Sequence, residues 1–220
     1  MMSIETEFAI DRLSIAEQVY RHIKKLILSG HLRGGEKVPE EKVALQFKVS
    51  RTPIREALRR LERYGLIYIK PRSYAVVVDL KPEEAAQIAV VRLAVEKLAA
   101  ELLCESLGEE DRAALEEMAA ECSRLIKRGN RGDAFEVDSR FHLELARRTG
   151  NPHLYEIAEK LDAKVQLLRL NQKTPLDELQ GYISQHDRLL KLLTAKDKAG
   201  LAELLQRHIM HDLDFASKQA

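Results

Sequence analysis

Four polar side chains lie where apolar residues are expected in the C-terminal part of the sequence. Asp138 and His142 are four residues apart within one apolar stripe, so on a helix they project from the same face. His186 and His208 each interrupt an apolar stripe of their own. One carboxylate and three imidazoles are a suitable ligand set for a divalent transition metal, with coordination positions left for water or another ligand.

A short turn near residue 197 would bring the last two histidines together. His186 and His208 each lie eleven residues from that position. In an antiparallel helix pair, residues equidistant from the turn lie at the same height, on axes roughly 8–10 Å apart. Any one of these histidines alone is better explained as a hydrogen-bonded core residue. All four positions together favour a metal site, with zinc, nickel or manganese as candidate ions.

A second group of candidate residues is basic and lies in the first third of the chain. Residues 47–72 contain eight Lys or Arg against two Asp or Glu, although the net charge of the chain is only +1. Arg51 and Arg55 share one face of a helix that Ser50 can cap. An arginine can form two hydrogen bonds to a guanine edge, and a helix N-terminus attracts phosphate. A solvated basic helix face would give the same count, so composition alone does not decide.

The elements that would hold these basic residues are three helices and a hairpin. The helices are expected from the Ser14 cap to about Ser29, from Pro39 to Phe47, and from the Ser50 cap to Gly65. Two β-rich runs follow, Leu66–Lys70 and Tyr74–Asp79, on either side of a Pro-Arg-Ser turn. This is the winged helix-turn-helix plan, in which the third helix enters the major groove of DNA.

The sequence changes character at residue 82, where amphipathic helical periodicity begins. Six helices are expected, at about 82–106, 109–129, 131–149, 152–171, 176–195 and 198–217. Their short connections indicate antiparallel neighbours. The predicted fold class is therefore mainly α, with a winged helix-turn-helix domain at 1–80 and a six-helix antiparallel bundle at 81–220.

The run VSRTPIREALRRLERYGLI at residues 49–67 closely resembles the DNA-binding domain of GntR-type regulators, and residues 20–48 fit the same pattern. The resemblance implies DNA contacts by the entry of the third helix and by the wing, at Ser50, Arg51, Thr52, Arg55, Arg72, Ser73 and Tyr74. Arg59 and Arg72 are better placed for phosphates than for bases. Ser73 stands where the wing of the family usually has glycine, which puts close backbone approach to the minor groove in doubt.

Three further runs resemble the FCD ligand-binding domain of FadR-like regulators: VRLAVEKLAAEL at 91–102, DSRFHLELARRTGNPHL at 138–154 and QHDRLLKLL at 185–193. Six helices rather than seven resemble the VanR-type subgroup. The resemblance implies that Asp138, His142, His186 and His208 bind metal and that a small carboxylate binds beside it. Arg92 is the candidate clamp for that carboxylate, but Glu96, four residues on, offers a plain salt bridge instead. Weaker cavity candidates are Tyr155, Arg169 and Asn171.

These features predict a ligand-responsive transcription regulator rather than an enzyme. It is expected to be a repressor that binds, as a homodimer, operator DNA with two-fold-related half-sites. A regulator that responds to the metal alone, and a metalloenzyme, are the alternatives; the second needs a further acid or base that the helical stripes do not offer. Without an apolar run of roughly 18 residues, a signal peptide or a cysteine framework, a cytoplasmic protein without membrane association is expected.

Overall fold

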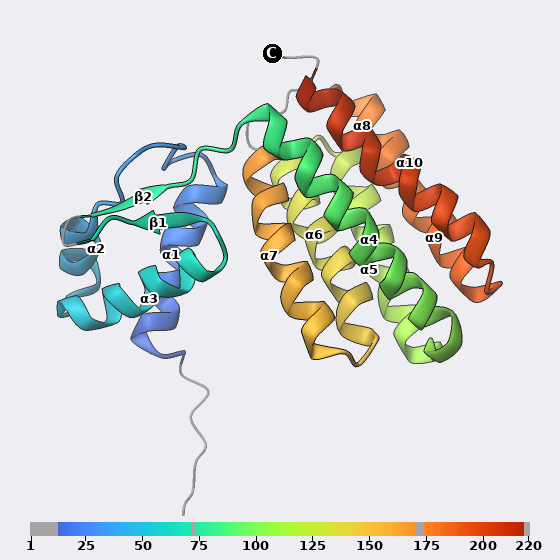
Figure 1. Cartoon of the computed structure of the whole chain (residues 1–220), viewed down its shortest axis with the longest axis horizontal. Coiled ribbons are helices and arrows are strands. Elements are labelled where there is room, and N and C mark those ends of the chain that lie inside the picture. The colour runs from blue at the N-terminus through green and yellow to red at the C-terminus, as the bar shows by residue number, and fades with distance from the viewer. Residues whose placement is uncertain (1–12, 72–73, 170–173, 218–220) are drawn as a thin grey trace, which may run out of the picture.

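The computed structural model describes residues 13–71, 74–169 and 174–217, and it is mainly helical. The N-terminal part contains α1 (Ile15–Leu28), α2 (Glu40–Phe47), α3 (Arg51–Arg63), β1 (Ile67–Ile69) and β2 (Ala75–Val77). The C-terminal part contains α4 (Pro82–Ser106), α5 (Glu109–Lys127), α6 (Arg131–Arg148), α7 (Pro152–Arg169), α8 (Leu176–Ile183), α9 (Gln185–Thr194) and α10 (Lys198–Ser217). Figure 1 shows the three helices and the hairpin beside the helical bundle, which confirms the predicted fold class.

The N-terminal part is organised around the packing of α3 on α1. Ser14 caps α1, because its Oγ accepts a hydrogen bond from the Glu17 amide at 3.1 Å. Ser50 is the N-cap of α3 in an extended conformation, but its side chain makes no capping hydrogen bond. The two strands pair antiparallel with Tyr68 opposite Val76. The apolar face of α3 is buried with that of α1, through residues that include Val19, Ile23, Ile27, Ile54, Leu58 and Leu61.

The C-terminal part is an antiparallel bundle with its own apolar core. In it α4 lies along α10 and α7, and α5 lies along α6. Its core contains Leu103, Leu115, Phe141, Leu189 and Leu205. None of the helices in the described part of the chain combines the length and apolar character that crossing a bilayer needs.

One expected helix differs from the structure, because residues 176–195 form two helices rather than one. The division falls at Ser184, whose backbone stays close to helical with φ −62° and ψ −17°. Its Oγ donates a hydrogen bond to the Gly181 carbonyl oxygen at 2.7 Å, and such side-chain competition for helix carbonyls disturbs the regular ladder. The described bundle therefore has seven helices, so the helix count does not support the VanR-type subgroup.

Helix α7 packs against both parts of the chain. Ala163 and Leu167 belong to the apolar cluster of the N-terminal part. The Tyr64 hydroxyl, directly after α3, donates a hydrogen bond to Glu159 Oε2 at 3.2 Å. The two parts are therefore joined by side-chain packing as well as by the chain between β2 and α4.

Candidate metal centre and nucleic-acid interface

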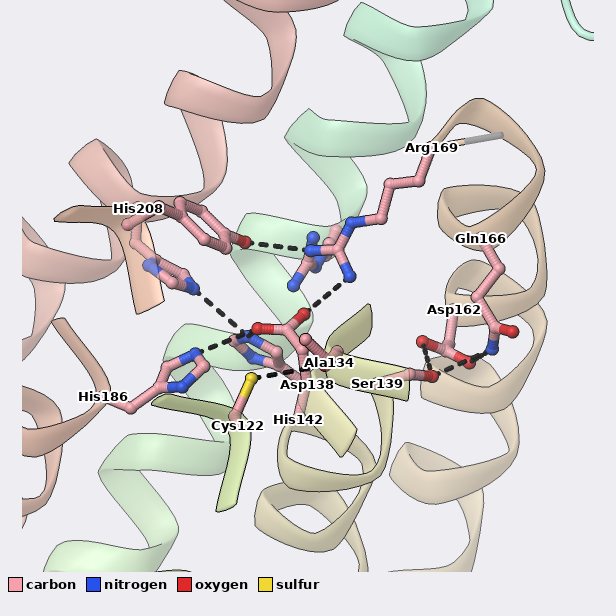
Figure 2. Close-up of polar contacts among 12 residues, drawn as sticks. Cys122, Ala134, Asp138, Ser139, His142, Asp162, Gln166, Arg169, His186 and His208 are labelled. Atoms are coloured by element: carbon pink, nitrogen blue, oxygen red, sulfur yellow. Dashed lines mark hydrogen bonds and ion pairs between the residues drawn. The ribbon is translucent and has the colours of Figure 1, made fainter. Parts of the chain in front are cut away.

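The four residues predicted to bind metal come together inside the bundle. Asp138 and His142 project from α6, His186 from α9 and His208 from α10, and all four are buried. One ligand atom from each lies within 4.8 Å of the others. Figure 2 shows the carboxylate and the imidazoles pointing toward a common point. The stripe positions and the equal distances from the turn were therefore sufficient to predict this convergence.

The atoms that face one another in this cluster are a carboxylate oxygen and imidazole nitrogens. Asp138 Oδ1 lies 3.2 Å from His186 Nε2 and 3.7 Å from His142 Nε2. His142 Nε2 lies 3.1 Å from His208 Nε2. Apart from this 3.2 Å contact with each other, Asp138 Oδ1 and the ring nitrogens of His186 have no hydrogen-bond partner among the described residues. Buried polar atoms without partners are uncommon and call for an explanation such as an ion.

The contacts on the outer side of the rings fix the form of two histidines. His142 Nδ1 lies 2.8 Å from Glu96 Oε2, and His208 Nδ1 lies 3.2 Å from Gln185 Oε1. Both partner oxygens are acceptors, so each Nδ1 carries the hydrogen and each Nε2 of a neutral ring has a lone pair. Two such lone pairs 3.1 Å apart repel each other, and a metal ion bound by both nitrogens would remove that repulsion. The donor set fits a divalent cation.

The protonation states of the cluster match those of metal ligands. Burial alone would raise the pKa of Asp138, but Arg169 and the histidines hold this pKa well below its usual range. Arg169 Nη1 donates to Asp138 Oδ2 at 2.6 Å, which leaves Oδ1 facing the histidines. Burial lowers the pKa of His186 and of His208, so both rings are neutral at neutral pH. Neutral imidazole is the form that binds metals.

A pocket adjoins the cluster between α4, α6 and α7. Arg92, Glu96 and His142 line it together with Asp162. Its apolar lining is Val95, Ala99, Leu143, Ala146, Ala158 and Leu161. Arg92 Nε donates to Glu96 Oε1 at 2.6 Å, so the salt bridge offered by the sequence spacing is formed while Arg92 also faces the pocket.

The weaker cavity candidates have other positions. Tyr155 donates to Glu159 at 3.1 Å and does not line this pocket. Arg169 contacts the predicted metal ligand Asp138 and the Tyr182 hydroxyl instead. Asn171 lies outside the described residues. The contact between Arg169 and Asp138 is the feature that sequence reasoning missed, since nothing in the spacing links the end of α7 to α6.

The predicted DNA-binding residues on α3 share one surface. Ser50, Arg51, Thr52, Arg55 and Arg59 are all exposed, and the apolar residues of α3 lie on the opposite side. Arg60 differs from its neighbours, because it pairs with Glu17 and lies over the Tyr20 ring at 4.0 Å. The exposed face at the start of α3 therefore presents Arg51, Arg55 and Arg59, although Glu56 is exposed among them.

The wing is described only in part. Arg72 and Ser73 lie outside the described residues. Tyr74 is half-buried, with Lys37 Nζ 3.9 Å from its ring centre and Lys70 Nζ 3.3 Å from its hydroxyl. Lys37 is thus a further basic residue beside the wing, which the sequence analysis did not single out.

The N-terminal part has winged helix-turn-helix geometry with a basic α3 surface. It is joined to a helical bundle built around a polar cluster. Together these features are those of a two-domain DNA-binding regulator. The sequence matches the bacterial regulatory proteins of the gntR family over residues 15–77, and the FCD domain over residues 87–211. The chain belongs to the GntR family, with a GntR helix-turn-helix domain and an FCD domain.

Several relatives are similar over most of their length. The chain is 28% identical over 198 residues to the uncharacterized HTH-type transcriptional regulator YdhC of Bacillus subtilis, covering 90% of this chain and 88% of YdhC. It is 29% identical over 203 residues to the HTH-type transcriptional regulator McbR of Escherichia coli, covering 90% and 92%. It is 27% identical over 201 residues to the gluconate operon transcriptional repressor of Bacillus licheniformis, covering 86% and 79%.

A solved structure of E. coli McbR has the same fold. It aligns with a TM-score of 0.83 at 26% identity, over 94% of this chain and 99% of the McbR chain. The family and these relatives are transcriptional regulators and not enzymes. The metalloenzyme alternative is therefore dropped.

Proposed function

We propose that this regulator represses transcription by binding, as a homodimer in the cytoplasm, to operator DNA with two-fold-related half-sites. A small organic acid, bound beside a divalent metal in the FCD domain, controls that binding. The observation that carries the proposal is the set of four buried donor atoms within 4.8 Å of one another, in the same chain as an exposed basic α3. A homodimer is proposed because a single winged helix contacts few bases, and pairing half-sites multiplies specificity.

The proposed DNA contacts follow from exposure and chemistry on α3. Arg51 and Arg55 are exposed at the entry of the helix, where their guanidinium groups can each form two hydrogen bonds to a guanine. Ser50 and Thr52 lie beside the free amides of the helix N-terminus, which attract phosphate. Arg59 lies one helical turn after Arg55 and is assigned to a phosphate of the DNA backbone. The wing would add Arg72, Ser73 and Tyr74.

The proposed metal ligands are the carboxylate and the three imidazoles of the cluster. Asp138 Oδ1 and the Nε2 atoms of His142, His186 and His208 would hold the ion, and zinc, nickel or manganese suits such a mixed set. When bound, the metal supplies a positive charge that attracts an organic carboxylate. The lone-pair arrangement described above supports a cation here over a plain hydrogen-bonded core.

The effector is proposed to occupy the pocket that adjoins the metal centre. Arg92 and His142 both line this pocket, so an acid within it would lie near a guanidinium and near a metal ligand. Guanidinium groups bind carboxylates through two parallel hydrogen bonds. The pocket is otherwise mainly apolar, which favours a small acid with a short apolar portion.

Helix α7 supplies a physical route from this site to the DNA-binding domain. Arg169 near its C-terminal end contacts Asp138, and Glu159 contacts Tyr64 at the end of α3. Glu159 and Arg169 are ten positions apart, or about 15 Å along a rigid helix. A ligand that favours one position of Arg169 over another would thereby favour one position of α3, which is how differential binding shifts a population.

Selection of binding sites from a random duplex pool tests the proposal. Zinc-loaded protein is expected to enrich two half-sites about one DNA turn apart, and the double variant Arg51→Ala/Arg55→Ala is expected to lose the enrichment. The affinity for the enriched duplex is then measured by fluorescence anisotropy at fixed salt for metal-free protein, zinc-loaded protein, and zinc-loaded protein with each of a panel of small mono- and dicarboxylates. We expect at least one acid to weaken operator binding.

The arms of this experiment separate the alternatives. A change of affinity on zinc loading, with no response to any acid, would identify the metal itself as the signal. Equal affinity in all three states would reject ligand control and leave only a DNA-binding protein. Failure to enrich any sequence would reject the assignment of the α3 surface.

A further inference from the structure

We infer that Glu96 is a positioning residue that holds His142 in the form that binds metal and, with the same carboxylate, holds Arg92 at the wall of the adjoining pocket. The inference rests on the proposed metal centre and adds to it a residue that touches neither the ion nor the DNA. It is carried by one buried carboxylate with two different partners. Glu96 Oε2 lies 2.8 Å from His142 Nδ1, and Glu96 Oε1 accepts from Arg92 Nε at 2.6 Å.

The chemistry of a carboxylate determines what it does to the ring. A neutral imidazole carries its hydrogen on either nitrogen, and the partner of one nitrogen decides which. The Glu96 carboxylate forms a buried ion pair with the Arg92 guanidinium, in which Glu96 Oε1 accepts from Arg92 Nε. An ionised carboxylate only accepts hydrogen bonds, so the hydrogen of His142 is placed on Nδ1. The Nε2 lone pair is then directed at Asp138 and His208.

The other two histidines of the cluster have no comparable support. His208 Nδ1 faces a neutral amide oxygen of Gln185 at the longer distance of 3.2 Å. His186 Nδ1 has no hydrogen-bond partner among the described residues. Glu96 is thus, within the part of the chain that the structure describes, the one charged group in contact with the outer nitrogen of a histidine in the cluster. Partners of this kind orient a ligating ring and raise its basicity.

The alternative is that Glu96 only neutralises Arg92 in a buried ion pair. Glu96→Gln removes the charge and replaces one of the two accepting oxygens with an amide NH2 group, so either Arg92 or His142 then faces a donor. Arg92→Gln removes the ion pair and leaves the contact between Glu96 and His142 intact. A positioning role predicts that only the first substitution alters His142, whereas a purely structural role predicts similar effects of both.

Two measurements test the inference on the full-length protein. Zinc affinity is measured by competition with a chromophoric chelator, and the hydrogen position on His142 is read from long-range proton–nitrogen NMR of histidine-labelled metal-free protein. Glu96→Gln is expected to weaken zinc binding by about 10- to 100-fold and to abolish the single Nδ1–H form. Glu101→Gln is the matched control, since Glu101 is exposed on the same helix, and it should leave both readouts unchanged.

The possible results are decisive in each case. Wild-type zinc affinity in Glu96→Gln, with His142 unchanged, would overturn the inference and leave the metal centre intact. If wild-type protein binds no zinc, the metal centre fails, and the NMR readout alone judges whether Glu96 fixes the ring. If Glu96→Gln does not fold, an Nε2–H form of His142 in metal-free wild-type protein would still overturn it.

Discussion

The hydroxyl of Tyr64 donates a hydrogen bond to Glu159 Oε2 at 3.2 Å and so links the end of α3 to α7. The other oxygen of Glu159 accepts from the Tyr155 hydroxyl at 3.1 Å. Burial raises the pKa of both phenols, that of Tyr155 to about 12, so both remain donors at neutral pH. The helix proposed to read DNA is therefore attached to the same helix that carries Arg169.

Substitution of Glu159 tests whether this attachment transmits the effector signal. In Glu159→Gln one amide oxygen replaces two carboxylate oxygens, so at least one of the two tyrosines loses its acceptor. We expect zinc affinity to stay at the wild-type value while the effect of zinc or acid on operator affinity falls by a factor of about 5 or more, which corresponds to about 1 kcal/mol of coupling. Fluorescence anisotropy with the enriched duplex measures the change.

The control for this substitution lies on the same helix. Glu156→Gln removes an equal charge from an exposed residue, which pairs with Lys160 one turn along the same helix. It should leave the coupling unchanged. Equal coupling in wild-type protein and in Glu159→Gln would show that the signal does not depend on the Glu159 carboxylate.

Loss of Arg169 should destabilise the metal-free protein strongly. Arg169→Gln leaves the Asp138 carboxylate, which is fully buried, without its cationic partner. Removing one partner of a buried ion pair costs about 3–5 kcal/mol. We expect a loss of this size in the free energy of unfolding measured with urea, and a partial recovery on addition of zinc because the ion would compensate the same charge.

An exposed ion pair provides the comparison for Arg169. Arg140→Gln breaks the contact between Arg140 and Glu121 on the surface, which is expected to change the unfolding free energy by less than about 1 kcal/mol. A similarly small change for Arg169→Gln would contradict the view that Asp138 depends on this arginine.

The sequence predicted more of the metal cluster than of its surroundings, for a physical reason. Asp138 and His142 are one helical turn apart, and His186 and His208 are related by a tight turn, so local periodicity and symmetry place them. Arg169 reaches Asp138 across 31 residues of sequence, through a packing of α7 on α6 that no spacing encodes.

The same distinction applies to the remaining elements. Tyr64 and Glu159 are separated by 95 residues, so their contact depends on how the two domains pack. The spacing of Arg92 and Glu96 was compatible with either a salt bridge or a ligand clamp. Only the three-dimensional structure shows that Arg92 forms the salt bridge and also lines the pocket. The periodicity of residues 176–195 correctly predicted helix, but the side chain of Ser184 divides that stretch into α8 and α9.

The stability of the metal-free protein should fall as the pH is lowered below 6.5. His186 and His208 both have a pKa below the ordinary value of 6.5 because of burial, so the unfolded chain binds more protons than the folded one in this range. The two histidines contribute fully to the free energy of unfolding above the pKa they have in the unfolded chain. This contribution is lost as the pH falls toward the lower pKa they have in the folded protein. Each histidine contributes a slope of up to about 1.4 kcal/mol per pH unit.

Urea unfolding of the metal-free protein at a series of pH values from about 7.5 to about 5 checks this expectation. His208→Gln should show a smaller slope than wild-type protein, because one of the two groups has been removed. His153→Gln, at an exposed position, should keep the wild-type slope. A metal-free protein whose stability does not change over this range would contradict the assignment of neutral, buried imidazoles.

The division of labour on α3 predicts two different kinds of DNA-binding defect. Arg55→Ala should reduce the preference for the enriched duplex over an unrelated one by about 5- to 150-fold, because a two-hydrogen-bond contact to a base is worth about 1–3 kcal/mol of discrimination. Arg59→Ala should weaken binding to the enriched duplex and to the unrelated duplex equally. It should also reduce the slope of log affinity against log salt by about 0.9, as loss of one phosphate contact requires. Arg140→Gln, on the bundle surface away from α3, is the control and should change neither quantity. If Arg55→Ala lowered affinity for both duplexes equally, Arg55 would be a phosphate contact, and sequence discrimination would have to come from other residues of the α3 surface.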